Sequence, residues 1–186
     1  MRSLSILMFA TFYPPYNFGG DGVGVQRMVR ALAARGHDVT VVHDEDAYLN
    51  LGGKLSVGAD DPGIRRIGLR SRAGLLSDLL VQQAGRPMFH AGRLREIVAE
   101  RAWDIVWYNN PSLIGGPGLL EYGAGLRVYE AHEHWLVCPT HVLWRHQREL
   151  CTGRECLRCS LAYHRPPQLW RRTGTLDRQL DKMDLI

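Results

Sequence analysis

The apolar run Ser5-Ile-Leu-Met-Phe-Ala10 decides the fold, because it is continuous and bounded by turn residues. Such a run predicts a strand that is covered on both faces, as in a parallel sheet. The Pro- and Gly-rich residues 13–24 predict a loop. Apolar side chains then follow the spacing of one helix face, and Gly36 ends the helix. These side chains are Val25, Met28, Val29, Leu32 and Ala33. Residues 39–42 are a second strand, so this region predicts a right-handed β–loop–α–β unit.

The alternation of strands and helices continues along the chain. We expect further strands at residues 64–69, 103–108 and 126–130. We expect helices at residues 94–98, 113–122 and 169–183. This order predicts an α/β fold, a Rossmann-like open parallel sheet with helices on both faces, in one domain over residues 1–186. Residues 136–165 form a Cys-rich irregular insertion, residues 44–61 a surface excursion, and residues 184–186 look like the opening of a further strand.

The composition bounds the class of protein. The 186 residues are 45% hydrophobic and 23% charged, which is typical of a globular domain and not of a disordered chain. No apolar run reaches about 18 residues, so the sequence contains no membrane-spanning helix. Leu4–Tyr13 has the length of a signal-peptide core but lacks a small-residue cleavage site and runs into Pro14-Pro15. We therefore expect a cytoplasmic protein, with a cleaved signal as the alternative.

The positive charge is concentrated near the end of the sequence. Residues 145–178 hold eight arginines and three acidic residues, which gives a net charge of +5, whereas the whole chain has a net charge of +4. One interpretation is a solvated face. The other is a docking surface for phosphate groups or for anionic lipid at the inner face of a membrane.

Polar residues follow three of the expected strands. They are the glycine-rich residues 19–24, then Asn109 and Asn110, then His132, Glu133 and His134. In open α/β sheets, ligands bind beyond the carboxyl ends of the strands. The sequence therefore predicts a binding site where these three segments meet.

The glycine-rich segment Gly19-Gly20-Asp21-Gly22-Val23-Gly24 precedes a helix. Glycine lets backbone N–H groups approach a ligand, and a helix N-terminus favours phosphate or pyrophosphate. The dinucleotide fingerprint G-x-G-x-x-G is broken, since Val25 stands where its third glycine belongs. Asp44, an acidic residue near the end of the second strand, is a feature of nicotinamide-binding folds. A nicotinamide-dependent oxidoreductase is therefore an alternative, although the broken fingerprint disfavours it. A turn without a ligand is the other alternative.

His132 and Glu133 are the candidate catalytic residues. A histidine at a strand end can polarise or hydrogen-bond a substrate, and Glu133 can act as a base or orient a hydroxyl group. The alternative is a histidine that is satisfied by a backbone carbonyl. The position beyond a strand end supports the functional interpretation to the point where both interpretations stay open.

The four cysteines lie within 22 residues of one another, at Cys138, Cys151, Cys156 and Cys159. Four clustered thiolates predict a tetrahedral structural zinc site, in which a nearby histidine (His141, His146 or His164) can replace one thiolate. Iron–sulfur ligation and four unrelated thiols remain alternatives. No recognition helix accompanies the cluster, so we expect no nucleic-acid partner.

Four motifs in order resemble family 4 glycosyltransferases of the GT-B fold. The first is Tyr13-Pro-Pro-x3-Gly-Gly, and the second covers residues 32–42. The third, residues 104–109, resembles a strand of that family that ends in Asn. The fourth, residues 132–139, resembles a segment H-D-x-W-x-x-C-P found with a downstream C-x-G and C-x-x-C. The resemblance covers nearly the whole chain.

The resemblance implies the N-terminal, acceptor-side domain of a retaining glycosyltransferase. Such an enzyme transfers a sugar from a nucleotide-sugar to a glycan or lipid-linked acceptor and needs no catalytic divalent metal. By match, Gly19 and Gly20 lie near the donor pyrophosphate, and His132 contacts the donor sugar. Asp21, Gly22, Asn109 and Asn110 belong to the donor or acceptor site. Glu133 stands where the family has Asp, so its role is open.

The family's C-terminal domain, which binds the donor through an E-x7-E motif, has no counterpart in these 186 residues. We therefore expect the isolated chain to transfer sugar very slowly or not at all without a C-terminal domain or a partner chain. The alternative function is a non-catalytic Rossmann-like binding module, clipped by a metal ion, that docks on a partner or on a membrane.

Overall fold

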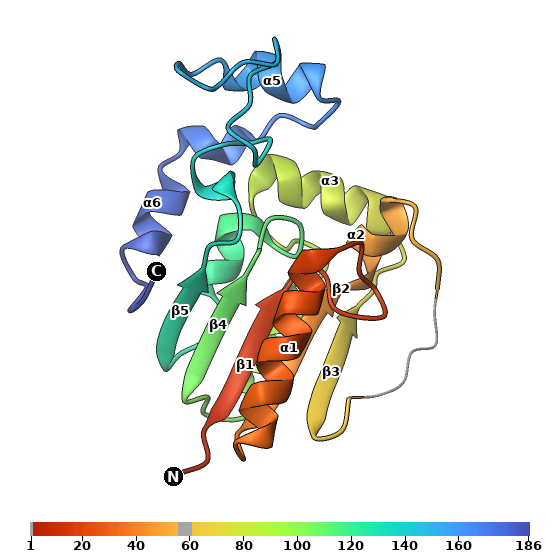
Figure 1. Ribbon diagram of the computed structural model, residues 1–186, viewed down its shortest axis with the longest axis vertical. Helices are drawn as coiled ribbons and strands as arrows, with labels where there is room; N and C mark the ends of the chain where they lie inside the picture. The colour runs from red at the N-terminus through yellow and green to blue at the C-terminus, as the bar shows by residue number, and fades with distance from the viewer. Residues whose placement is uncertain (1, 56–60) are drawn as a thin grey trace.

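The computed structural model describes residues 2–55 and 61–186 and confirms the α/β fold. Five strands form one parallel sheet in the order β3-β2-β1-β4-β5. They are β1 (Ser5–Ala10), β2 (Asp38–Asp44), β3 (Ile64–Leu69), β4 (Ile105–Asn109) and β5 (Leu126–Glu130). The carboxyl ends of the strands meet at the upper edge in Figure 1, and helices flank the sheet.

The central strand β1 is buried on both faces, as its apolar run predicts. Side chains alternate across a strand, so Ile6 and Met8 pack with Val25 and Val29 of helix α1 (Gly20–Ala34). Leu7 and Phe9 point to the other face, into a core formed with further helices. These are α4 (Ala91–Ala99), the 3-10 helix η1 (Gly116–Glu121) and α6 (Thr175–Leu180). Burial of each large apolar side chain in this way contributes about 1.5–3 kcal/mol to the free energy that stabilises the folded state.

The expected loop over residues 13–24 is wrong in its last part, because α1 already begins at Gly20. Gly22 is buried in the first turn, where a Cβ atom would lie 2.5 Å from Oδ1 of Asn17. Close packing here favours glycine, although glycine weakens a helix elsewhere. The helix ends as expected, with Gly36 at a φ of 87° directly after the capping residue Arg35.

The expected surface excursion over residues 44–61 is wrong for residues 44–49 and for Asp61, whereas residues 50–55 are largely exposed, as expected, and residues 56–60 lie outside the described part. Residues 45–50 form the helix α2 (Glu45–Asn50). Asp44, Asp46 and Asp61 are buried, because each has partners that a polar sequence does not reveal. A further helix, α3 (Gly74–Ala84), packs against α2.

The Cys-rich residues 136–165 are largely irregular, as expected, and stand beyond the carboxyl ends of the strands in Figure 1. They include the short helix α5 (Cys156–Ala162) and follow the 3-10 helix η2 (His134–Leu136). Arg171, in the 3-10 helix η3 (Leu169–Arg172), donates hydrogen bonds to the carbonyls of Trp135 and Leu136. Its guanidinium also lies 4.5 Å from the ring centroid of Trp170. Arg171 thereby ties the insertion to the body of the domain.

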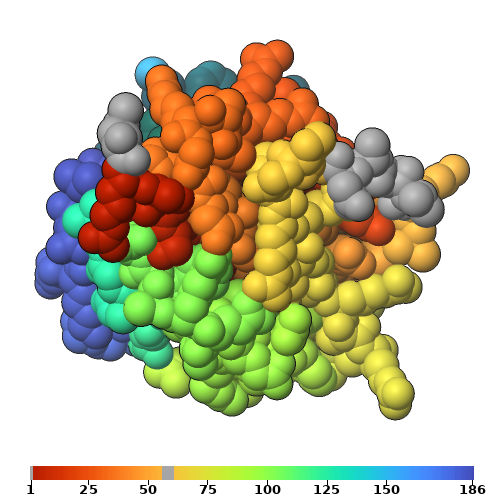
Figure 2. All heavy atoms as spheres, turned by 90° about the horizontal axis from the view of Figure 1, so that it is seen from below, coloured from red at the N-terminus to blue at the C-terminus, as the bar shows by residue number. Residues whose placement is uncertain are grey.

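The expected helix over residues 169–183 is two helices, η3 and α6, separated by Gly174 at a φ of 63°. The expected strand-like end is present as a single parallel bridge between Leu185 and Val128 of β5. At the opposite, amino-terminal edge, Ser3 Oγ donates to the carbonyl of Gly36 and Arg2 pairs with Asp104. Figure 2 views this edge, where the first residues (red) lie beside the segments before β2 and β4.

In the described part of the chain, every helix is too short or too polar to cross a bilayer.

Gly125 generates a prediction about stability. It has a φ of 103°, and a Cβ atom would lie 2.3 Å from the carbonyl oxygen of Trp103. Gly125→Ala should lower the free energy of unfolding by at least about 2 kcal/mol, because it adds both strain and a backbone clash. Urea denaturation followed by circular dichroism measures this.

Gly24→Ala is the matched control. Gly24 lies inside α1, and its Cβ would meet nothing within 4 Å. This change should raise the free energy of unfolding by up to about 1 kcal/mol, because alanine favours a helix. Equal effects of the two substitutions would contradict the backbone geometry at Gly125.

Candidate functional site

The strand order reverses between β1 and β4, and the residues after these strands are joined by hydrogen bonds. Oγ1 of Thr11 donates to the carbonyl of Asn110 at 2.6 Å. Nδ2 of Asn110 donates to Oδ2 of Asp21 at 2.8 Å, in the first turn of α1. Asn110 has a φ of 44°, a conformation that Asn tolerates better than most residues. The structure therefore confirms that two of the three predicted segments meet, at the point where open α/β sheets bind ligands.

The third segment joins them through Asn109, the last residue of β4. Its Nδ2 lies 2.7 Å from Nε2 of His132 and donates to Oε2 of Glu130 at 3.2 Å. Oε1 of Glu130 lies 3.1 Å from the same His132 nitrogen. Asn109 is fully buried, whereas the His132 side chain keeps 33% of its exposure. A buried amide, itself bonded to a carboxylate, thus contacts one edge of an accessible imidazole, which fits a group that contacts a substrate.

The N-terminus of α1 opens onto the same edge of the sheet. Gly19 and Gly20 are exposed, and a Cβ atom at either position would meet nothing within 4 Å. No side chain caps this 15-residue helix, so its first N–H groups are available. With the positive end of the helix dipole, they favour an anion such as a phosphate. Asp21 also lies in this turn, with its carboxylate held by Asn110.

Glu133 does not join His132 in this arrangement. Its Oε1 lies 2.6 Å from Nδ1 of His141, which belongs to the Cys-rich segment. The residues that surround His132 are instead Asn109 and Glu130. Sequence reasoning missed Glu130, although its place as the last residue of a strand was a usable signal. It also missed the pairing of His141 with Glu133, for which the sequence holds no signal.

The four cysteines do not converge. Among the residues that the structure describes, no three of their sulfur atoms lie within 4.8 Å of one another. Cys138 is buried 3.2 Å from Oγ1 of Thr140, whereas Cys151 is exposed. Burial raises the pKa of Cys138, but hydrogen bonds from the Thr140 side chain and from the backbone of Thr140, Val142 and Leu143 outweigh burial and lower it overall. His146, a candidate replacement ligand, lies 2.6 Å from Glu155. The zinc site stays a prediction.

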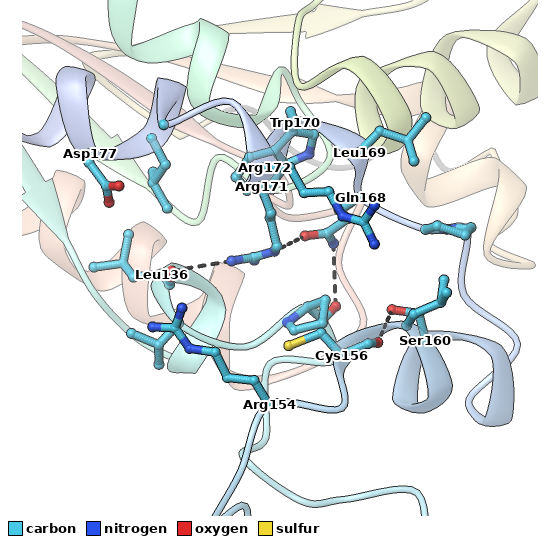
Figure 3. Close-up of a pocket in the computed structure, with 16 residues that line it drawn as sticks. Leu136, Arg154, Cys156, Ser160, Gln168, Leu169, Trp170, Arg171, Arg172 and Asp177 are labelled. Carbon is cyan, nitrogen blue, oxygen red and sulfur yellow. Dashed lines mark hydrogen bonds between the residues drawn. The ribbon is translucent and has the colours of Figure 1, made fainter.

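A groove of about 610 Å³ lies between the Cys-rich segment and η3. Figure 3 shows Arg154 and Cys156 on one side of it and residues 168–172 on the other. Leu136 and Trp170 supply apolar lining, and Arg171 is held by backbone carbonyls. Within the described residues, the guanidinium groups of Arg154 and Arg172 have no hydrogen-bond or ion-pair partner. The groove therefore suits a ligand with both apolar and anionic parts.

Comparison with known proteins finds a partial similarity. The chain is 32% identical over 117 residues to glycogen synthase of Mycobacterium tuberculosis, in the strains CDC 1551 / Oshkosh and ATCC 25618 / H37Rv. The match covers 55% of this chain but 27% of each relative, so the chain spans about a quarter of their length. No protein-family model matches the chain.

His43, at the carboxyl end of β2, is buried with 1% exposure, and neither ring nitrogen has a hydrogen-bond partner among the described residues. Its ring stacks on Tyr16 with 5.4 Å between the centroids. Burial, with a smaller contribution from the positive charge of Arg66, lowers the pKa of His43 to about 4. The imidazole is therefore neutral in the folded protein at neutral pH.

This burial predicts a pH dependence of stability. The unfolded state takes up a proton near pH 6.5, but folded His43 does so only near pH 4, so stability is lost as the pH falls between these values. Relative to His43→Phe, which cannot titrate, the protein should lose about 3 kcal/mol of unfolding free energy from pH 7.5 to pH 4. Urea denaturation at each pH measures this difference. Parallel pH curves for the two proteins would contradict a neutral His43.

Proposed function

We propose that the chain is the N-terminal, acceptor-side domain of a retaining family 4 glycosyltransferase of the GT-B fold. The observation that carries the proposal is the joining of Asn109, Glu130 and His132 beside the open N-terminus of α1. The similarity to glycogen synthase, a glycosyltransferase, supports the same class of reaction.

The reaction replaces one bond at the anomeric carbon of the donor sugar. The bond from this carbon to the donor phosphate breaks, and the nucleoside diphosphate leaves with the bonding electrons. An acceptor hydroxyl oxygen forms the new bond on the same face of the sugar, and its proton passes to the phosphate oxygen that leaves. The free N–H groups at Gly19 and Gly20 would stabilise the charge on the departing phosphate.

His132 would contact the donor sugar next to the reacting carbon. Asn109 and Glu130 act through His132 by fixing the edge of the imidazole that carries Nε2. A fixed ring loses less orientational freedom when substrate binds, which lowers the barrier to reaction. In this proposal a divalent metal has no role in the transfer step, and Glu133 acts through its contact with His141.

The groove suggests the class of acceptor. Arg154 and Arg172 suit a phosphate group, and the apolar lining suits a hydrocarbon part, so the acceptor is phosphate-bearing or lipid-linked. Exposed apolar side chains lie close to the groove in the sequence: Leu157, Leu161 and Leu169. Together with the basic charge of this stretch, they fit peripheral contact at the cytoplasmic face of a membrane.

The proposal leads to a test with a donor-binding domain. The 186-residue chain alone should release nucleoside diphosphate from UDP-, ADP- or GDP-linked sugars at the background rate. Joined to a GT-B donor-binding domain, it should transfer sugar, and His132→Ala should lower kcat by about 100-fold or more. His37→Ala, at the amino-terminal edge of the sheet, is the control histidine variant and should keep its kcat.

Two results would contradict the proposal. The first is robust turnover by the 186-residue chain alone, because it would show that no second domain is needed. The second is an unchanged kcat in His132→Ala. Tight binding of a partner, with no sugar transfer when the donor-binding domain is supplied, would favour a non-catalytic binding module instead.

A further inference from the structure

Three buried side chains with metal-ligating atoms converge beside the end of β2, at some distance in the sequence from the candidate site. They are Asp44, the last residue of β2, Asp46 in the first turn of α2, and His90, which precedes α4. Their exposures are 1%, 4% and 3%. One ligating atom from each lies within 4.8 Å of the other two.

The hydrogen bonds around this cluster fix the carboxylates and leave the imidazole unsatisfied. Oδ1 of Asp44 accepts a hydrogen bond from the backbone of Ala47, and Oδ2 of Asp46 accepts one from the backbone of Ser71. Nε2 of His90 lies 3.2 Å from Oδ2 of Asp46 but makes no hydrogen bond. A buried ring nitrogen without a hydrogen bond lowers the stability of the folded state. This nitrogen also lies next to a carboxylate oxygen that already accepts a hydrogen bond from Ser71.

The charges of the cluster call for a cation. The carboxylate of Asp78 lies near Asp44 and adds a further acidic group to this buried region. Oδ1 of Asp78 is also buried without a hydrogen-bond partner. Two carboxylates and an imidazole that are buried together suit the binding of a metal ion.

We propose that Asp44, Asp46 and His90 bind one divalent transition-metal ion, of the kind represented by Zn²⁺ and Mn²⁺. One imidazole nitrogen with two carboxylate oxygens suits these ions, whereas Mg²⁺ and Ca²⁺ prefer oxygen ligands alone. The ligating atoms need to move by less than the width of a side chain, because ligands around one ion lie about 3–4 Å apart.

The ion would act as a structural clamp. Asp44 ends β2 and caps α2, Asp46 accepts from Ser71 just before α3, and a Cβ atom on Gly74 would lie 2.8 Å from Oδ1 of Asp46. A bound ion adds the segment at His90 to this junction. It therefore ties four segments together behind the carboxyl edge of the sheet, independently of sugar transfer.

The first test uses the unmodified chain after removal of metal with a chelator. Titration with Mn²⁺, followed by electron paramagnetic resonance, should show about one bound ion per chain. The bound ion should carry the hyperfine coupling of a histidine nitrogen, which a thiolate site would not give. Zn²⁺ in parallel should raise the thermal midpoint of unfolding, because the ion binds the folded state. Absence of saturable Mn²⁺ binding, or bound Mn²⁺ without nitrogen coupling, would overturn the proposal.

The second test uses substitutions that keep the side-chain shapes. Asp46→Asn and His90→Gln should each weaken Mn²⁺ binding by at least about tenfold, with folding checked by circular dichroism. The double variant Cys156→Ser/Cys159→Ser is the control and should bind Mn²⁺ like the unmodified chain. Equal Mn²⁺ affinity in His90→Gln and the unmodified chain would contradict the assignment, as would loss of Mn²⁺ binding in the cysteine variant.

Discussion

The burial of β1 on both faces is the constraint on which the rest of the structure depends. Its side chains alternate between two apolar cores, so helices must cover both sides of the sheet. The polar groups of the candidate site then lie at the carboxyl edge of the sheet, where the strands end. The carboxyl edge carries Thr11, Asn109, Asn110 and Glu130, which bond to one another and to their neighbours. The candidate site is thus a consequence of how the core is covered.

Much of the fold could be predicted because strong apolar patterns decide it. The run at residues 5–10 and the strand at residues 126–130 have the expected bounds in the structure. The helix α3 could not be found, since it exposes Leu75 and Leu76 while it buries Ser77. Polarity also misleads for α2: Asp46 is buried because Ser71, 25 residues away, donates to it. Patterns along the chain report local periodicity but not such distant partners.

The sequence predicts where the candidate site lies in the fold better than it predicts which side chains contact one another there. Parallel strands bring their carboxyl ends together, so the approach of Asn109 to His132 follows from topology. The direction of a side chain does not follow from topology, which explains why Glu133 turns to His141 instead of joining His132. The groove beside Arg172 depends on how an irregular segment packs on η3, for which the sequence has no periodic signal.

The central claim is that the carboxyl edge between β1, β4 and β5 binds a nucleotide-sugar. Titration of the ¹⁵N-labelled chain, joined to a GT-B donor-binding domain, with UDP-, ADP- and GDP-linked glucose, followed by amide chemical shifts, tests this claim most directly. The account predicts saturable shifts at Gly19, Gly20, Asn110 and His132 with at least one of these donors. Saturable shifts confined to other parts of the chain, or no shifts with any donor at millimolar concentration, would contradict it.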